Sequence, residues 1–133
     1  GSMSGSVITN VLTTGSLSIP AMKRIGFQPH VAGGVEACAS TGGVLMPPIM
    51  GATAFIMAIN LEVPYRDIVV AAVIPSVLYF FALFMQIDGY AARNKLEGLP
   101  KIELPTVRQT LKDGWYYVAV FALLIVVPLI VNP

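Results

Sequence analysis

The stretch Ala39-Ser40-Thr41-Gly42-Gly43-Val44-Leu45-Met46-Pro47-Pro48 decides the fold, because it places helix-breaking residues inside an apolar segment that runs from about Val31 to Leu61. Hydrocarbon offers no partner for the N–H and C=O groups that an interrupted helix exposes. Such an interruption is therefore stable only where protein buries it or where it lines a polar cavity. The stretch predicts a broken transmembrane helix over residues 29–61, and interruptions of this kind are typical of transport sites.

The composition favours a membrane protein. Hydrophobic residues make up 56% of the chain and charged residues 11%, and the mean hydropathy is +0.77. A soluble helical domain is the alternative, but it needs surface charge, and between Ile25 and Tyr65 only Glu36 and Glu62 are ionised. The net charge of +1 gives no sign of nucleic-acid binding. We therefore expect a lipid bilayer, and no nucleic acid, as a partner.

The rest of the chain divides into shorter segments. Residues 1–3 are interpreted as the remnant of an expression tag. Residues 4–28 contain a Ser-Gly-Ser corner, an apolar half-span from Val7 to Ile19, and an exit into water marked by Pro20 and Gly26. Residues 62–90 include 20 residues without a charge, from Ile68 to Ile87, which predicts a spanning helix. Residues 91–112 are a polar, basic connector, and residues 113–133 a last spanning helix that begins with aromatic residues.

The basic residues predict the orientation of the chain. One cluster is Lys23-Arg24, and the second lies in the connector. If Lys23 and Arg24 are cytoplasmic, the broken helix crosses the membrane, the helix over 62–90 returns, and the connector is again cytoplasmic. Both clusters then obey the positive-inside rule.

Two oxygen-rich stretches are the candidate binding site. The corner Ser4-Gly5-Ser6 precedes the half-span, and Ser40-Thr41-Gly42-Gly43 would meet it near the middle of the bilayer if the two elements pack antiparallel. Unwound carbonyls and hydroxyls are neutral oxygen ligands that suit Na⁺. Asn10 is expected to face the bundle, because its amide is hard to satisfy within its own helix. The candidate substrate and cation ligands are Ser4, Gly5, Ser6, Asn10, Ser40, Thr41, Gly42 and Gly43, with Ser6, Thr41 and Gly43 expected on Na⁺.

Other polar residues leave alternatives open. The hydroxyls of α-helical Thr and Ser residues commonly bond to their own helix, and this is the expectation for Thr9, Thr13, Thr14, Ser16 and Ser18. Glu36 is the only carboxylate between Pro29 and Asn60. It could act in the site, or reach headgroups, or pair with His30 or Lys23. A hydrolytic dyad of Ser6 and His30 is not expected, because His30 lies at an aqueous boundary and Ser6 near the midplane. We therefore expect no enzyme activity.

Several motifs resemble one transporter family. They are Ser4 to Gly15, Ile19 to Phe27, Ala39 to Gly43 and Met46 to Gly51. Together they are similar to the large membrane subunit of tripartite ATP-independent periplasmic (TRAP) transporters, of the fused-permease kind. The similarity covers nearly the whole chain, with its strongest motifs up to about Pro64. Many members have Pro-Pro-Ser where this chain has Pro47-Pro48-Ile49, so this chain has no side-chain hydroxyl at position 49.

The resemblance implies an all-α membrane protein with a re-entrant hairpin limb, a broken transmembrane helix and two further transmembrane helices. It implies a secondary transporter of the cell inner membrane, in which an extracytoplasmic substrate-binding protein delivers an organic acid and a Na⁺ gradient drives uptake. Na⁺ would be the coupling ion, with no other cofactor. The remainder of the permease, including the other inverted repeat, would be a partner. The alternative function is a membrane scaffold or assembly subunit without a transport site of its own.

Overall fold

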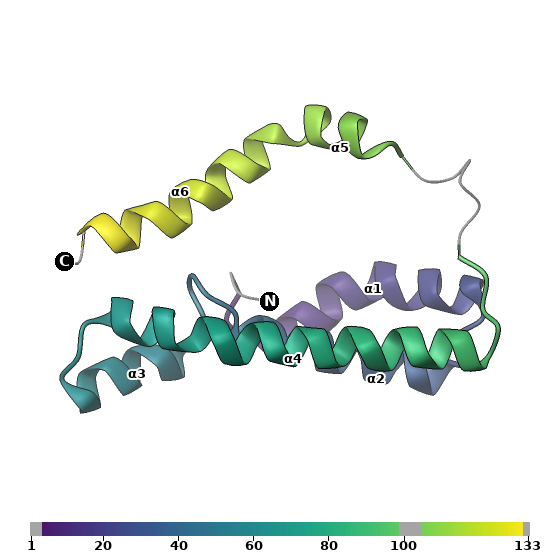
Figure 1. Cartoon of the computed structure of the whole chain (residues 1–133), viewed down its shortest axis with the longest axis horizontal. Coiled ribbons are helices and arrows are strands. Elements are labelled where there is room, and N and C mark those ends of the chain that lie inside the picture. Colours follow the sequence, from purple (N-terminus) through teal and green to yellow (C-terminus); the bar gives the residue numbers. More distant parts are fainter. Residues whose placement is uncertain (1–3, 99–104, 132–133) are drawn as a thin grey trace.

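The computed structural model describes residues 4–98 and 105–131, and everything it describes is helix, turn or loop. This confirms the all-helical prediction (Figure 1). The expected tag remnant at 1–3, part of the connector and the last two residues lie outside the described residues. The helices are α1 (Val7–Ile25), α2 (Pro29–Leu45), α3 (Ala52–Leu61), α4 (Tyr65–Arg93), α5 (Val107–Asp113) and α6 (Trp115–Val131).

The first two helices form an antiparallel hairpin. The hydroxyl of Ser6 caps α1 by accepting a hydrogen bond from the N–H of Thr9 at 3.4 Å. Helix α1 ends at Ile25, and Gly26 follows it with a φ of 115°, a left-handed conformation that glycine adopts without strain. The N–H of Phe27 bonds to the carbonyl oxygen of Met22 at 3.1 Å. The helix is therefore longer than the half-span expected from Val7 to Ile19, and the turn lies at Gly26, one of the two residues expected to mark it. A membrane helix can continue past one proline when neighbouring groups satisfy the freed carbonyl, and here the helix continues to Ile25.

The position of the helix break also differs from the expectation. Residues Ser40 to Gly43 are helical, so the prediction that the main chain is unwound there was wrong. The interruption lies between Leu45 and Ala52, and we call residues 46–51 the break. Met46 has φ −79° and ψ 123°, the extended conformation favoured for a residue before proline. Pro47 and Pro48 have no N–H to donate, so the prolines rather than the glycines end the helix.

Helix α4 lies along both halves of the broken element (Figure 1). The buried hydroxyl of Ser76 donates to the carbonyl of Leu45, the last residue of α2, at 2.8 Å. At Gly42 the two helices approach so closely that a methyl group there would lie 2.5 Å from Cε1 of Tyr79. Tyr79 in turn donates to the carbonyl of Cys38 at 2.9 Å. These contacts fix α4 beside the carboxyl end of α2.

Helix α4 has the length and composition of a membrane span. Its 29 residues extend about 44 Å at about 1.5 Å per residue. Among residues 4–98 and 105–131 it is the one helix that meets this test by itself; α5 and α6 become a second span only if the pair, bent by 71°, is taken as one. Helix α5 falls within the segment expected to be a connector. Its position there was not predicted.

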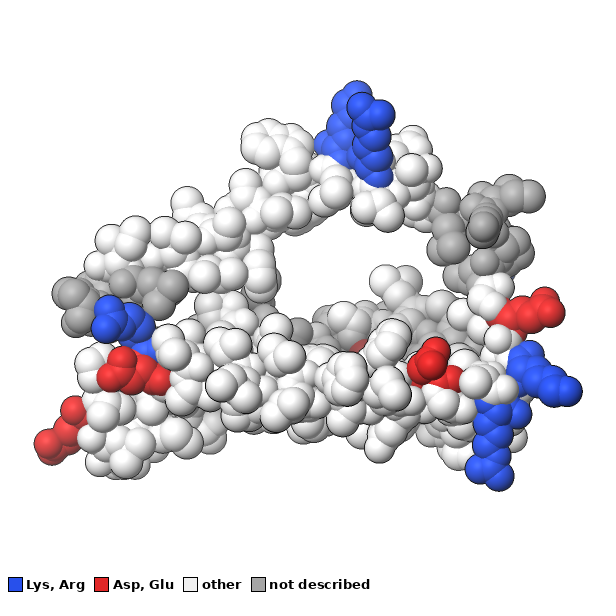
Figure 2. Space-filling view, in the orientation of Figure 1, with Lys and Arg blue, Asp and Glu red and all other residues white. Residues whose placement is uncertain are grey.

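The charged residues lie mainly at the ends of the long helices and on α5 (Figure 2). The turn after α1 lies beside the end of α4, because the rings of Phe27 and Tyr90 stack at 5.3 Å. The basic residues at this shared end are Lys23, Arg24, Arg93 and Lys95. The first basic cluster and the start of the second therefore lie at the same end of the helices, as the positive-inside argument requires.

Candidate functional site

The Ser-Gly-Ser corner lies directly against the break. Gly5 has a φ of 60°, and a methyl group on it would lie 3.2 Å from the carbonyl oxygen of Met50 and 3.6 Å from Cα of Gly51. From the other side, a methyl group on Gly51 would lie 3.7 Å from the carbonyl oxygen of Gly5. Two non-helical stretches of main chain are thus in contact through two glycines. A larger residue at Gly5 would press against the break, whereas one at Gly51 would first meet Cγ1 of Val44, at 2.7 Å.

The break is held in shape by hydrogen bonds to its carbonyl groups. The Tyr65 hydroxyl lies 2.6 Å from the carbonyl oxygen of Ile49 and 3.1 Å from that of Pro48. The N–H of Gly51 bonds to Val44 O at 3.1 Å, which closes the loop back onto the end of α2. A stacked ring pair, Phe55 and Tyr65 at 4.5 Å, joins the start of α3 to the start of α4. The carbonyl groups of the break are therefore fixed in position.

The polar side chains of the corner bond chiefly to one another. Ser4 Oγ donates to the carbonyl oxygen of Ser6 at 3.3 Å, and the hydroxyl of Thr9 donates to Ser6 Oγ at 3.3 Å. Ser6 Oγ also caps α1, as described above. The corner therefore gathers several oxygens at the start of α1. Hydroxyl and carbonyl oxygens are the kind of ligand that a hard cation prefers.

Asn10 links α1 to the predicted second stretch. Its Nδ2 donates to the buried Oγ of Ser40 at 2.8 Å, which confirms that Asn10 faces the bundle. Thr41 behaves differently, because it is exposed and its hydroxyl bonds to Ala37 O at 2.8 Å within α2. Gly42 is buried against Tyr79. Of the second stretch, Ser40 thus contacts α1, whereas Gly42 packs against α4.

Back-bonding to the helix, expected for the other hydroxyl residues of α1, is confirmed for several of them. Thr13 Oγ1 lies 2.8 Å from Thr9 O, and Ser16 Oγ lies 2.8 Å from Thr13 O. Thr14 and Ser18 do the same but also bond to Glu36 on α2. Glu36 is buried, and among the described residues it forms no ion pair with His30 or Lys23. The alternative of an ion pair with His30 or Lys23 is therefore wrong for the described residues.

Sequence reasoning missed the residues that complete the contact with the corner. Met50 and Gly51 meet Gly5, while Tyr65 and Ser76 hold the carbonyls around the break. The position of the break was signalled by Pro47 and Pro48 in the helix-breaking stretch, since consecutive prolines stop a helix more strongly than consecutive glycines do. Tyr65 and Ser76 of α4 could not be predicted as partners of the break, because a Tyr and a Ser near apolar residues also fit ordinary packing.

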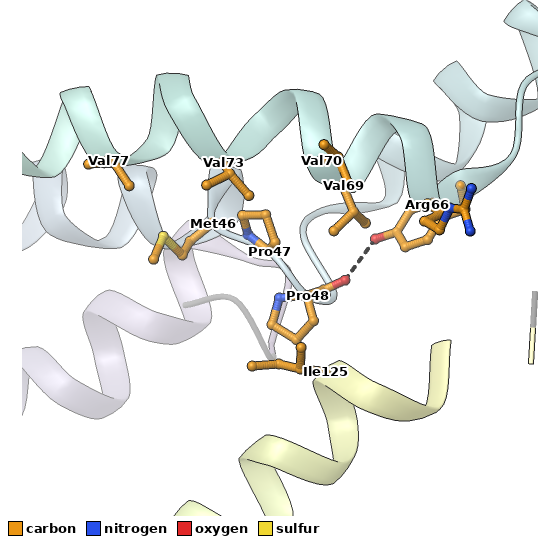
Figure 3. Close-up of a pocket in the computed structure, with 10 residues that line it drawn as sticks. Met46, Pro47, Pro48, Arg66, Val69, Val70, Val73, Val77 and Ile125 are labelled. Carbon is orange, nitrogen blue, oxygen red and sulfur yellow. Dashed lines mark hydrogen bonds between the residues drawn. The ribbon is translucent and has the colours of Figure 1, made fainter. Parts of the chain in front are cut away.

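The other side of the break borders an apolar cavity of about 300 Å³ (Figure 3). Met46, Pro47 and Pro48 line it from the break, and the valines of α4 line it from the opposite wall. Ile125 of α6 closes it from below in the view of Figure 3. The break therefore borders the polar corner on one side and the apolar cavity on the other. A cation would be stabilised only on the side of the corner.

Removing the amide of Asn10 is expected to weaken the hairpin. We expect Asn10→Ala to lower the stability of the protein in bilayers by about 1 kcal/mol, because the buried Ser40 hydroxyl loses its partner. In a double-mutant cycle with Ser40→Ala, the two losses should be non-additive by a similar amount. Thermal unfolding of the four proteins measures this coupling. Fully additive losses would contradict a direct Asn10–Ser40 bond.

The comparisons with known proteins agree on a family. Residues 1–131 match the family described as "Tripartite ATP-independent periplasmic transporter, DctM component". The chain belongs to this family. The DctM family is one of integral membrane permeases rather than enzymes, in line with the apolar helices.

Two relatives show how much of a permease the chain represents. It is 29% identical to the "C4-dicarboxylate TRAP transporter large permease protein DctM" of Pseudomonas aeruginosa over 77% of this chain and 23% of that protein. It is 27% identical to the "Uncharacterized protein y4mL" of Sinorhizobium fredii over 80% of this chain and 29% of that protein. The chain thus spans about a quarter of the length of these relatives. No solved structure matches it.

Proposed function

We propose that this chain supplies part of the ion and substrate machinery of a Na⁺-coupled TRAP uptake transporter of the cell inner membrane. A periplasmic substrate-binding protein delivers an organic acid, and the chain works together with the remainder of the permease. Membership of the DctM family supports the transport role. The relative named for C4-dicarboxylates supports a carboxylate-bearing substrate.

The observation that carries the proposal is the contact between the corner and the break. In a membrane, main-chain groups outside helices need partners that lipid cannot provide. Here a methyl group on Gly5 would lie 3.2 Å from the carbonyl oxygen of Met50, and one on Gly51 would lie 3.7 Å from the carbonyl oxygen of Gly5. Main-chain and hydroxyl oxygens brought together in this way are the usual coordination of Na⁺ in secondary transporters with broken helices.

In this arrangement α1 is the second limb of a re-entrant hairpin whose tip is the corner, and α2 with α3 forms the broken transmembrane element. Ser6 and the carbonyls of the break provide the cation ligands. Ser4 and Gly5 belong to the corner, and Asn10 bonds to Ser40 between α1 and α2. Thr41 and Gly43 lie in the same helix as Ser40, and Gly42 lets α2 approach Tyr79 of α4. The proposed site thus consists of these residues together with the break.

Uptake by the assembled transporter tests the proposal. In proteoliposomes that contain the permease and its binding protein, a Na⁺ gradient should drive uptake of a dicarboxylate and an equal K⁺ gradient should not. Ser6→Ala should raise the Na⁺ concentration for half-maximal uptake about tenfold, since one lost ligand or cap costs on the order of 1.4 kcal/mol. Ser16→Ala is the matched control, because Ser16 is exposed and bonds only to its own helix in the described contacts.

The outcomes separate the two functions. Uptake that is equal with both gradients would contradict Na⁺ coupling. If Na⁺ drives uptake but Ser6→Ala behaves like Ser16→Ala, the coupling stands, the assigned site is wrong and the scaffold alternative is favoured.

A further inference from the structure

We propose that Glu36 is a positioning residue for the cation site, because it fixes the axial register in which α1 lies against α2. The register decides whether the corner at the start of α1 meets the break that follows α2. The residues that hold Glu36 belong to neither of them, so Glu36 acts through α1. Its effect on Na⁺ affinity rests on the proposed function, whereas the register can be measured without Na⁺.

Glu36 is held by α1 at two points that lie one helical turn apart. Thr14 Oγ1 bonds to one carboxylate oxygen and Ser18 Oγ to the other. The side chain is buried, with 6% of its surface exposed. A single bond between two helices can tilt as they slide past each other. A group held at two points along the helix axis cannot slide without losing one of its bonds.

Gly15 makes this register specific. A methyl group on Gly15 would lie 3.1 Å from Cγ of Glu36, so the glutamate occupies the space that the glycine leaves. One turn before Gly15 the sequence has Val11, and one turn after it Ile19. A shift of α1 by one turn in either direction would therefore set a branched side chain against Glu36. The observed register gives the glutamate a gap and two hydroxyl partners together.

The same face of α1 carries the register to the corner. Asn10 lies one turn before Thr14, and its Nδ2 donates to the buried hydroxyl of Ser40 at 2.8 Å. Ser6 lies one further turn before Asn10 and caps the helix beside the break. At about 1.5 Å per residue, a slip of one turn would move the corner by about 6 Å along the axis. Such a slip would separate the corner from the break.

The register is linked to cation binding, because the proposed cation needs the corner and the break together. When only a fraction of the molecules is competent to bind, the apparent affinity falls by that fraction. Loss of the two bonds to Glu36 should lower the fraction of hairpins in the competent register. Bound Na⁺ should restore that register. More Na⁺ is then needed, but the maximum rate of uptake is kept.

Uptake by the assembled transporter in proteoliposomes tests the proposal. We expect Glu36→Ala to raise the Na⁺ concentration for half-maximal uptake about tenfold or more, since two hydrogen bonds are lost. The rate at saturating Na⁺ should stay near that of the unmodified transporter. Glu36→Gln should keep the unmodified Na⁺ dependence, because its carbonyl accepts from one hydroxyl and its amide donates to the other.

Ser18→Ala and Ser16→Ala are a matched pair for the same measurement. Both remove one hydroxyl from α1, but that of Ser18 bonds to Glu36 whereas that of Ser16 bonds to Thr13 O within α1. Ser18→Ala should raise the Na⁺ concentration for half-maximal uptake about threefold, the effect of one lost hydrogen bond. Ser16→Ala should leave it unchanged. The pair tests the proposal even if Glu36→Ala does not fold.

The register can be measured from the distance between Gly5 and Gly51. Their Cα atoms lie within about 5 Å, since a methyl group on Gly5, one bond of about 1.5 Å away, would lie 3.6 Å from Cα of Gly51. Carbon–carbon correlation spectra of the transporter in Na⁺-free bilayers should show a cross-peak between the two atoms, also in Glu36→Gln and Ser16→Ala. Glu36→Ala should weaken the cross-peak, and added Na⁺ should restore it.

The outcomes separate this inference from the proposed function. If uptake does not depend on Na⁺ but Glu36→Ala weakens the cross-peak, the function is wrong and the positioning role stands. If Na⁺ drives uptake and Glu36→Ala keeps both the cross-peak and the unmodified Na⁺ dependence, the positioning role is wrong. A rate that falls equally at every Na⁺ concentration in Glu36→Ala, or Glu36→Gln behaving like Glu36→Ala, would also overturn it.

Discussion

Gly42→Ala is expected to destabilise the protein by about 1–3 kcal/mol, the usual cost of adding a methyl group to a filled interface. The added carbon would lie 2.5 Å from Cε1 of Tyr79 and 3.0 Å from Cζ of Phe80. Tyr79 cannot move away freely, because its hydroxyl bonds to Cys38 O at 2.9 Å. Relief of the overlap therefore separates α2 from α4 or breaks that bond. Thermal unfolding in detergent or bilayers measures the loss.

Gly34→Ala is the matched control for this change. Gly34 is in the same helix, but a methyl group there meets nothing within 4 Å. It should stabilise α2 slightly, by up to about 1 kcal/mol, through helix propensity. In a Tyr79→Ala background the cost of Gly42→Ala should largely disappear, since the overlapping ring is gone. Equal stability of Gly42→Ala and Gly34→Ala would show that α2 and α4 are not in contact at Gly42.

Gly5→Ala should reduce Na⁺-driven uptake by about tenfold or more in the assembled transporter. A φ of 60° costs an alanine roughly 1–2 kcal/mol, and its methyl group would lie 3.2 Å from Met50 O. Both effects push the corner away from the break, where the proposed cation ligands meet. A loss of about 1.4 kcal/mol corresponds to a factor of ten in rate or binding. Initial uptake rates at equal permease content measure the effect.

The control for Gly5→Ala is Gly33→Ala. A methyl group at Gly33 lies in open space, so its uptake should match that of the unmodified protein. If Gly5→Ala transports as fast as Gly33→Ala, the close approach of the corner to the break is not needed for uptake, and the proposed site is wrong.

The sequence was sufficient to predict a helical protein with an interruption that includes Pro47 and Pro48, but not that Ser40 to Gly43 remain helical. Ser40 to Gly43 carry glycines that usually weaken helices, yet they remain helical, because Gly42 is fitted to Tyr79 and the Thr41 hydroxyl bonds to Ala37 O. Helix propensity is a preference of about 1 kcal/mol per glycine, which packing can override. The missing N–H groups of Pro47 and Pro48 cannot be restored by packing.

Part of the candidate site could likewise be predicted from the sequence, and part could not. The corner and Asn10 could be identified from the sequence, because unusual polar residues at the start of an apolar helix need partners. The partners of the corner could not, since Met50 and Gly51 reach it only through the antiparallel turn at Gly26. The helix over 107–113 was also missed, because a polar segment without apolar periodicity gives no helical signal.

The most direct test is a Na⁺ titration of glycine amide signals by nuclear magnetic resonance, with the assembled transporter in bilayers. We predict that the signals of Gly5 and Gly51 shift together with a common midpoint, since both glycines lie beside the proposed cation ligands. The signal of Gly98, where a methyl group would meet nothing within 4 Å, should not move. Signals at Gly5 and Gly51 that ignore Na⁺, or that respond equally to K⁺, would contradict the account.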